Sequence, residues 1–169
     1  MEIAMKQYIA PCISIIFTLM LLQPMAYAES IWDPKQPPAL IEKPLNITVY
    51  RSESCGCCKD WIDHLEKHNF KVDDIINNDM HTVKRELGLP GELASCHTGI
   101  IDGYVIEGHV PAQDIKKLVH RRPDIAGLAV PQMPHGSPGM ETGRKDEFSV
   151  IAFDKKGNFE QFSHYKNQH

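Results

Sequence analysis

The sequence lacks an excess of positive charge. Its 169 residues include 18 lysines and arginines against 22 aspartates and glutamates, which gives a formal net charge of -4. A chain of this charge has no basic field that would attract a phosphate backbone or an anionic lipid surface. We therefore do not expect nucleic acid as a partner.

Several short motifs of common enzymes are also missing. The sequence contains no G-x-S-x-G, no H-E-x-x-H, no Walker loop and no G-x-G-x-x-G that opens a helix. These patterns position nucleophiles, zinc ligands or phosphates, so their absence argues against hydrolase and nucleotide-dependent chemistry.

Long apolar runs are scarce, and the clearest one lies at the N-terminus. Residues 8–22 are mainly apolar, and Ala26 and Ala28 then form an A-x-A cleavage pattern. A run of about 15 residues is shorter than the roughly 20 that span a bilayer, and it suits a secretory signal peptide. We expect residues 1–28 to be this signal peptide, cleaved after Ala28, with no membrane span left in the mature chain.

The expected mature chain begins with a proline-rich leader over residues 29–44, a composition that favours an extended segment. Residues 45–169 then form one domain, because a mature chain of about 141 residues can bury a modest core without cysteine staples. Of the five cysteines, Cys12 lies in the signal peptide and would be removed, which leaves four.

Hydrophobic periodicity predicts the elements of this domain. Alternating or β-branched runs predict strands, and apolar residues at helical spacing predict helices. We expect strands over 45–50, 70–76, 98–101 and 104–107, helices over 58–69, 80–87 and 112–120, and a final hairpin over 148–165. Residues 127–143 are so rich in proline and glycine that we expect a long loop there. The fold class is therefore α/β, with a β-α-β-α-β-β-α core and an extra C-terminal β-hairpin.

Cys55 and Cys58 are spaced C-x-x-C, where a predicted strand gives way to a predicted helix. The N-terminus of a helix favours the thiolate form of such cysteines. Thioredoxin-like oxidoreductases place their redox cysteines at this point, and the predicted order of elements supports a thioredoxin-like fold. One interpretation is therefore a thiol-disulfide oxidoreductase, in which Cys55 attacks and Cys58 resolves.

Two further cysteines favour a different chemistry. Cys57 lies inside the pair and could attack either partner of a disulfide, whereas three sulfurs within four residues suit a soft metal ion such as Cu(I) or zinc. Cys96 precedes the strand at 98–101, and in a thioredoxin-like topology that loop lies beside the C-x-x-C turn. We expect Cys96 to join the cluster. A third interpretation remains open, in which an exported protein pairs its four cysteines in two structural disulfides.

Imidazole and thioether side chains near these cysteines are candidate additional ligands. His97 follows Cys96, His109 lies between the predicted hairpin and the third helix, and Met133 and Met140 lie in the loop rich in proline and glycine. Such donors suit copper better than zinc. Each also has an ordinary interpretation, because histidines often bond loops and methionines often fill cores, so both alternatives stay open.

Four ordered motifs together resemble the CopG-like family of periplasmic copper-resistance proteins, long described as a domain of unknown function. The motifs are Cys55-Gly56-Cys57-Cys58, Cys96-His97-Thr98, Glu107-Gly108-His109-Val110-Pro111 and residues 127–141. The resemblance implies a thioredoxin-like fold, a periplasmic location, a link to copper resistance and copper held mainly by the four cysteines. Gln132 departs from the pattern, since glycine is expected before Met133-Pro134.

The hypothesis that joins these observations is a copper-binding protein that holds Cu(I) as its metal. Its partners would be copper ions and other periplasmic copper-handling proteins. Whether the copper or the thiols also cycle between redox states, which would make the protein an enzyme, stays open, with the oxidoreductase of Cys55 and Cys58 as the alternative function.

Overall fold

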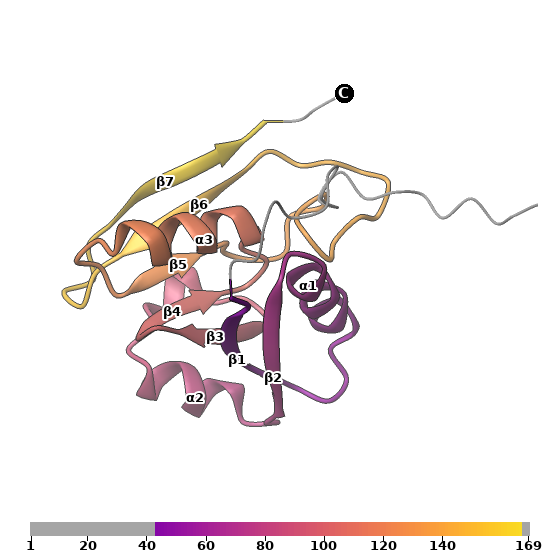
Figure 1. Cartoon of the computed structure of the whole chain (residues 1–169), viewed down its shortest axis with the longest axis horizontal. Helices are drawn as coiled ribbons and strands as arrows, with labels where there is room; N and C mark the ends of the chain where they lie inside the picture. The colour runs from indigo at the N-terminus through magenta and orange to yellow at the C-terminus, as the bar shows by residue number, and fades with distance from the viewer. Residues whose placement is uncertain (1–42, 167–169) are drawn as a thin grey trace, which may run out of the picture.

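The computed structural model describes residues 43–166, which form one mixed seven-stranded sheet with three α-helices (Figure 1). The elements in chain order are β1 (Leu45–Arg51), α1 (Gly56–Lys67), β2 (Phe70–Ile76), α2 (Met80–Glu86), the 3-10 helix η1 (Gly91–Leu93), β3 (His97–Ile101), β4 (Tyr104–Glu107), α3 (Ala112–Arg121), β5 (Gly127–Ala129), β6 (Phe148–Phe153) and β7 (Phe159–Tyr165). The predicted α/β class and the predicted order of elements are confirmed, with β5 in addition. The assignment to the thioredoxin-like fold stays a prediction.

The predicted signal peptide and nearly all of the leader lie outside the described residues. Within residues 43–166, no helix combines the length and the apolar character needed to cross a bilayer.

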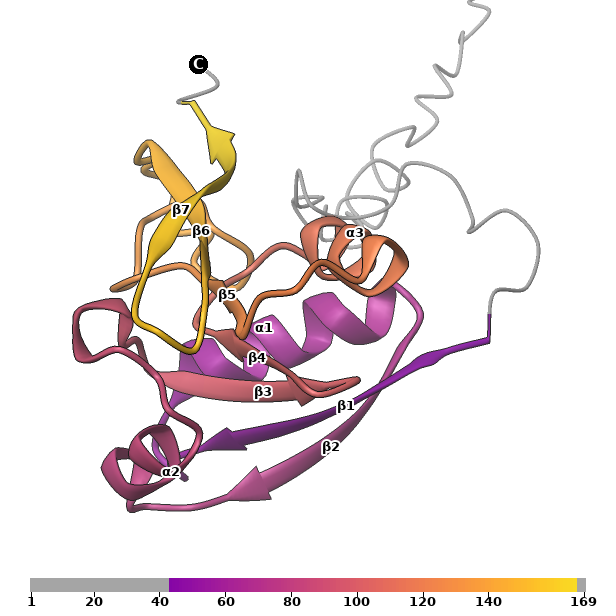
Figure 2. The same ribbon diagram turned by 90° about the vertical axis from the view of Figure 1, so that its left-hand side faces the viewer.

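The sheet has the strand order β2-β1-β3-β4-β5-β6-β7. The β1–β2 and β4–β5 pairs are parallel, and the other neighbours are antiparallel. Figures 1 and 2 show β2 and β7 at opposite edges. In the β1–β3 pair, Arg51 lies opposite His97, so the end of β1 meets the start of β3. The turn that follows β1 and the loop that precedes β3 therefore share one end of the sheet.

Apolar side chains form a core on each face of the sheet. On one face, Trp61 of α1 and Ile115 of α3 pack in the larger cluster together with Ile106 of β4. On the other face, Leu93 of η1 packs in a smaller cluster with Val105 of β4. Successive residues of a strand point to opposite faces, so β4 contributes to both cores. The sheet is thus buried on both sides in its central part, which holds the strand ends near the site in place.

The prediction of a loop over 127–143 was wrong at its start, where β5 lies between β4 and β6 and pairs with both. Leu128, Ala129 and Val130 are fully buried there. A strand buried on both faces forms a short continuous apolar run, which periodicity alone does not distinguish from other apolar segments. The prolines, which remove donors from a ladder, begin only at Pro131, so the irregular segment starts there.

Candidate metal centre

Two segments far apart in the sequence bring four cysteines together. Cys55, Cys57 and Cys58 lie at the start of α1, and Cys96 lies just before β3. Because Arg51 and His97 are opposite each other in the β1–β3 register, the residues beyond these two positions emerge side by side. The convergence of Cys96 on the C-x-x-C turn, expected from the topology, is what the structure shows.

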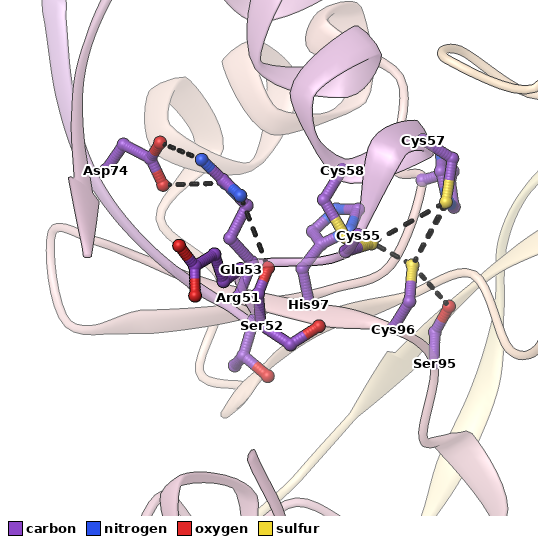
Figure 3. Close-up of a disulfide and its surroundings, with 12 residues drawn as sticks. Arg51, Ser52, Glu53, Cys55, Cys57, Cys58, Asp74, Ser95, Cys96 and His97 are labelled. Carbon is purple, nitrogen blue, oxygen red and sulfur yellow. Dashed lines mark hydrogen bonds and ion pairs between the residues drawn. A yellow bond between two sulfur atoms is a disulfide. The ribbon is translucent and has the colours of Figure 1, made fainter. Parts of the chain in front are cut away.

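The sulfur atoms lie within a few ångströms of one another (Figure 3). Cys55 and Cys58 form a disulfide, whereas Cys57 and Cys96 are free thiols. The Cys57 sulfur is 3.7 Å from that of Cys55 and 4.0 Å from that of Cys96. All four sulfurs lie within 4.8 Å of one another, a spacing in which they could share a metal ion. Among the described cysteines, the structure thus contains one disulfide and not the two of the purely structural interpretation.

The Arg51 side chain, at the end of β1, bonds both β2 and the first residue of the cysteine turn. The Arg51 guanidinium donates to both carboxylate oxygens of Asp74, at 2.9 and 2.5 Å, and to the Ser52 carbonyl at 3.2 Å (Figure 3). The helix itself begins after Cys55 without a side-chain cap and with no acidic residue in its first turn. The first N–H groups of the helix are therefore not capped by a side chain, and the helix N-terminus favours negative charge near the cysteines.

Cys96 is the centre of a second group of donors. Its sulfur lies 3.2 Å from Nδ1 of His97 and 3.3 Å from Nε2 of His109. These three donor atoms also lie within 4.8 Å of one another. Burial raises the pKa of the Cys96 thiol to about 12, and the neighbouring Cys57 adds to the shift. Without a cation the group is therefore a neutral thiol, and a bound metal ion would have to displace its proton.

Both histidines are fully buried and neutral at pH 7. Burial is the largest cause that lowers the pKa of His109, and burial followed by the nearby His109 lowers that of His97 well below its usual value. His97 lies against the Trp61 ring, with centroids 4.3 Å apart. Its Nε2 has no hydrogen-bond partner among the described residues. Leaving this buried nitrogen without a partner costs free energy.

The orientation of His109 is fixed by a backbone carbonyl. Its Nδ1 lies 2.8 Å from the oxygen of Pro138, and only a protonated Nδ1 can bond to a carbonyl. In the neutral ring Nε2 then carries the lone pair, and it is this atom that faces Cys96. Histidines that bind metals commonly donate their other nitrogen to a carbonyl in this way.

The segment after β5 packs directly over the cysteine turn. Gly139 has φ +81°, and a Cβ atom at this position would lie 2.6 Å from the Trp61 backbone nitrogen and 3.0 Å from the Cys57 carbonyl oxygen. Only glycine fits this approach. Residues 138 and 139 therefore contact both the start of α1 and His109.

The two candidate methionine ligands differ in exposure. Met133 is 49% exposed, Met140 is half-buried, and the two lie on either side of the Pro138–Gly139 contact. Their role as ligands stays a prediction. Gln132, where glycine was expected, has φ +63°, which explains in physical terms why glycine suits this position.

Sequence reasoning missed a buried polar network beside Cys96. The Glu107 carboxylate is fully buried and bonds Lys84, Thr98 and the Ser95 N–H. Burial raises the pKa of Glu107, and the Lys84 ammonium opposes that shift. The signal available was Glu107 itself, an acidic residue that ends an otherwise apolar strand.

Fold and site together define a class: a mixed α/β domain with a cysteine and histidine cluster able to hold a metal ion. The family described as "Protein of unknown function, DUF411" matches residues 93–140. Two solved structures, "Copper resistance protein copG- Form 1" and "Form 2", are 52% and 53% identical to this chain. They cover 73% and 72% of this chain and 99% and 98% of their own, each with a TM-score of 0.70. No curated protein matches the chain. The chain belongs to the CopG-like copper-resistance family.

Proposed function

We propose that this is a periplasmic copper-binding protein that holds Cu(I) through Cys55, Cys57, Cys58 and Cys96 and contributes to copper resistance. The observation that carries the proposal is the convergence of four sulfurs within 4.8 Å of one another. The relatives' printed name, copper resistance protein, supports copper as the metal.

The spacing of the sulfurs suits a metal–thiolate site. In a tetrahedral site with metal–sulfur bonds of about 2.3 Å, the sulfurs lie roughly 3.8 Å apart. The distances of 3.7 Å from Cys55 to Cys57 and 4.0 Å from Cys57 to Cys96 are close to this value. Thiolates are soft ligands that favour Cu(I), and the neutral Nε2 of His109 adds an oriented nitrogen donor.

Copper uptake by all four cysteines requires the reduced protein. An external thiol reductant supplies two electrons and two protons that convert the disulfide between Cys55 and Cys58 into two thiols, and these release their protons to solvent when they bind the metal. The same turn thereby links metal binding to the redox state of the protein. His97, Met133 and Met140 are further candidate ligands at the edge of this cluster.

The test is an anaerobic titration of the reduced mature protein with Cu(I) against a competing chelator. We expect tight uptake that protects all four thiols from alkylation. In Cys57→Ser the affinity should fall by at least about 100-fold, more than the loss of an outer partner costs. Ser54→Ala, an exposed neighbour in the same turn, is the matched control and should behave as wild type. Unchanged affinity and stoichiometry in Cys57→Ser would refute the proposal.

A second candidate function is supported by the disulfide itself. Cys55 and Cys58 are paired at the N-terminus of α1, where a thiol-disulfide oxidoreductase would carry its redox cysteines. In that case the protein should catalyse insulin reduction after strict removal of metal, and Cys55→Ser should abolish the activity. No turnover with or without metal would count against this function.

The periplasmic location rests on the expected signal peptide. Mass spectrometry of the protein recovered from a periplasmic extract should give a chain that begins at Glu29. Recovery of the full-length chain from the cytoplasm would contradict the location.

A further inference from the structure

The Lys84–Glu107 ion pair lies beside the site and has no part in the cysteine chemistry described so far. The Lys84 nitrogen is 2.5 Å from Oε1 of Glu107, and the two side chains are 13% and 0% exposed. Removing such a pair from water costs several kcal/mol per ion, and apolar residues of similar size are often as stable. A buried pair is therefore weak support for a purely stabilising role, and its contacts have to be considered one by one.

The carboxylate of Glu107 holds the chain on both sides of Cys96-His97. Its Oε1 accepts the Ser95 backbone N–H at 2.5 Å, and its Oε2 accepts the Thr98 hydroxyl at 2.6 Å. Residues 95 and 98 are those directly before and after the Cys96-His97 pair. One side chain thus fixes both ends of the two-residue segment that carries a sulfur and an imidazole of the candidate centre.

Lys84 completes the arrangement from α2. Besides Glu107, its ammonium bonds the Thr98 hydroxyl at 2.9 Å. Leu87 and Leu89, directly after α2, pack against the smaller apolar cluster, although no residue of the helix itself is fully buried. Lys84 adds a polar contact from this helix, and its cation offsets the buried negative charge of Glu107.

A second contact of Ser95 extends the network to the segment after β5. The Ser95 hydroxyl donates to the carbonyl oxygen of Gln132, and a Cβ atom at Gly108 would lie 2.7 Å from the Ser95 side chain, so the two residues are closely packed. Cys96 is thereby held at 4.0 Å from the Cys57 sulfur. Because Cys96 is the one cysteine of the cluster from outside the turn, its position decides whether a fourth sulfur is available.

We propose that Glu107, supported by Lys84, is a positioning residue that holds Cys96 in place as the fourth thiolate of the copper site. The inference rests on the proposed function. It predicts that loss of the network would leave a three-cysteine site in which Cys96 no longer shares the metal.

The experiment compares the alkylation of Cys96 in Cu(I)-loaded wild type and in Lys84→Met/Glu107→Leu. Apolar residues of similar volume should keep the protein folded, and they remove the carboxylate oxygens that accept from Ser95 and Thr98. We expect Cys96 to be alkylated at least about tenfold faster in the double variant and the copper affinity to fall by about 10- to 100-fold, as for other outer partners of metal ligands. Cys55, Cys57 and Cys58 should stay protected.

The matched control removes another ion pair with a fully buried carboxylate, that of Lys117 with Asp114 on α3. Lys117→Met/Asp114→Leu should lose stability without any change in the alkylation of Cys96. Glu107→Gln keeps one acceptor oxygen and should therefore retain most of the protection of Cys96 from alkylation. Thr98→Val removes one bond to Glu107 and serves if the double variant does not fold; it should raise the alkylation of Cys96 by a smaller factor.

Two outcomes separate the claims. If wild type does not protect four thiols with Cu(I), the proposed function fails. If wild type protects four thiols, and Cys96 stays equally protected in the folded double variant or in Thr98→Val, the positioning role of Glu107 is refuted while the proposed function stands.

Discussion

The two sides of the candidate centre are built in different ways. On the turn side, Cys55 and Cys57 are partly exposed, and the helix that carries them begins without a side-chain cap. On the strand side, His97 and His109 are fully buried, the Ser95 N–H donates to Glu107, and Nδ1 of His109 lies 2.8 Å from the Pro138 carbonyl oxygen. One side can change its bonding, and the other is fixed by the fold.

This difference suggests a division of roles. The turn side contains the disulfide and therefore the sulfurs whose covalent state changes with the redox state of the protein. The strand side supplies donors that are already oriented before any metal arrives, which lowers the reorganisation that binding requires. Substitutions in either side, and in the helix and loop residues around them, test this comparison against matched variants.

The largest effect is expected where Gly139 packs against the start of α1. In Gly139→Ala the new methyl group would lie 2.6 Å from the Trp61 backbone nitrogen, and the residue would also have to keep φ +81°. We expect a loss of about 2–4 kcal/mol in the free energy of unfolding, measured with urea. Gly143 has a similar φ of +84° but open space around it, so Gly143→Ala should lose only about 1 kcal/mol. Equal losses in the two variants would contradict the close packing at Gly139.

A smaller effect is expected from an oriented donor on the strand side. In His109→Gln the side chain can still bond the Pro138 carbonyl but no longer presents a ring nitrogen to Cys96. The Cu(I) affinity should fall by about 10- to 100-fold, with little change in stability. His120→Gln, an exposed histidine on α3, is the control. An unchanged affinity would mean that His109 does not contribute to copper binding.

The pH dependence of stability should show how strongly the buried His64 ties α1, the helix of the turn side, to the start of α3. Burial, followed by the charges of His68 and Lys67, lowers the pKa of His64 from 6.5 to about 3. Its neutral Nε2 accepts the Ala112 N–H at the start of α3. Below pH 6.5 the unfolded chain binds a proton that the folded one does not, so stability is complete above pH 6.5 and is lost progressively towards pH 3.

At pH 5 this group should cost about 2 kcal/mol of the free energy of unfolding relative to pH 7.5. Urea unfolding at the two pH values measures the loss, which His64→Gln should reduce. His81→Gln, which changes an exposed histidine on α2, should leave the loss unchanged. A loss that is the same in wild type and His64→Gln would show that His64 is not the acid-sensitive group.

The smallest effect is a gain. Gln132 adopts a left-handed conformation that costs a residue with a side chain about 1–2 kcal/mol, part of which glycine loses again through its greater freedom in the unfolded chain. Gln132→Gly should therefore stabilise the protein by about 0.5–1 kcal/mol in urea unfolding. Glu141→Gly, in the same segment but without a positive φ, should not stabilise it. A destabilised Gln132→Gly would show that the side chain has a role that compensates for the backbone cost.

Sequence patterns predicted the parts of the molecule that repeat locally. The strand predicted over 70–76 is β2, and the hairpin predicted over 148–165 is formed by β6 and β7. The meeting of Cys96 with the C-x-x-C turn was also predicted, because it follows from the order of the strands. The ligand roles of the cysteines, histidines and methionines stay predictions.

Contacts between distant residues were not predictable in the same way. Lys84 meets Glu107 across 23 positions, and His109 meets the Pro138 carbonyl across 29. Neither pair belongs to a periodic pattern, and each depends on the packing of segments that periodicity does not place relative to one another. Strand β5 was missed for a related reason, since its three buried residues lie next to a segment rich in proline and glycine.

The central claim is that copper is bound by sulfur from both sides of the centre. X-ray absorption at the copper edge of the reduced, Cu(I)-loaded protein tests this claim most directly, with Cys96→Ser as the comparison. We predict a sulfur-dominated shell around Cu(I) in wild type and fewer sulfur neighbours in Cys96→Ser. A shell of nitrogen and oxygen in wild type, or an identical sulfur shell in the two proteins, would contradict the account.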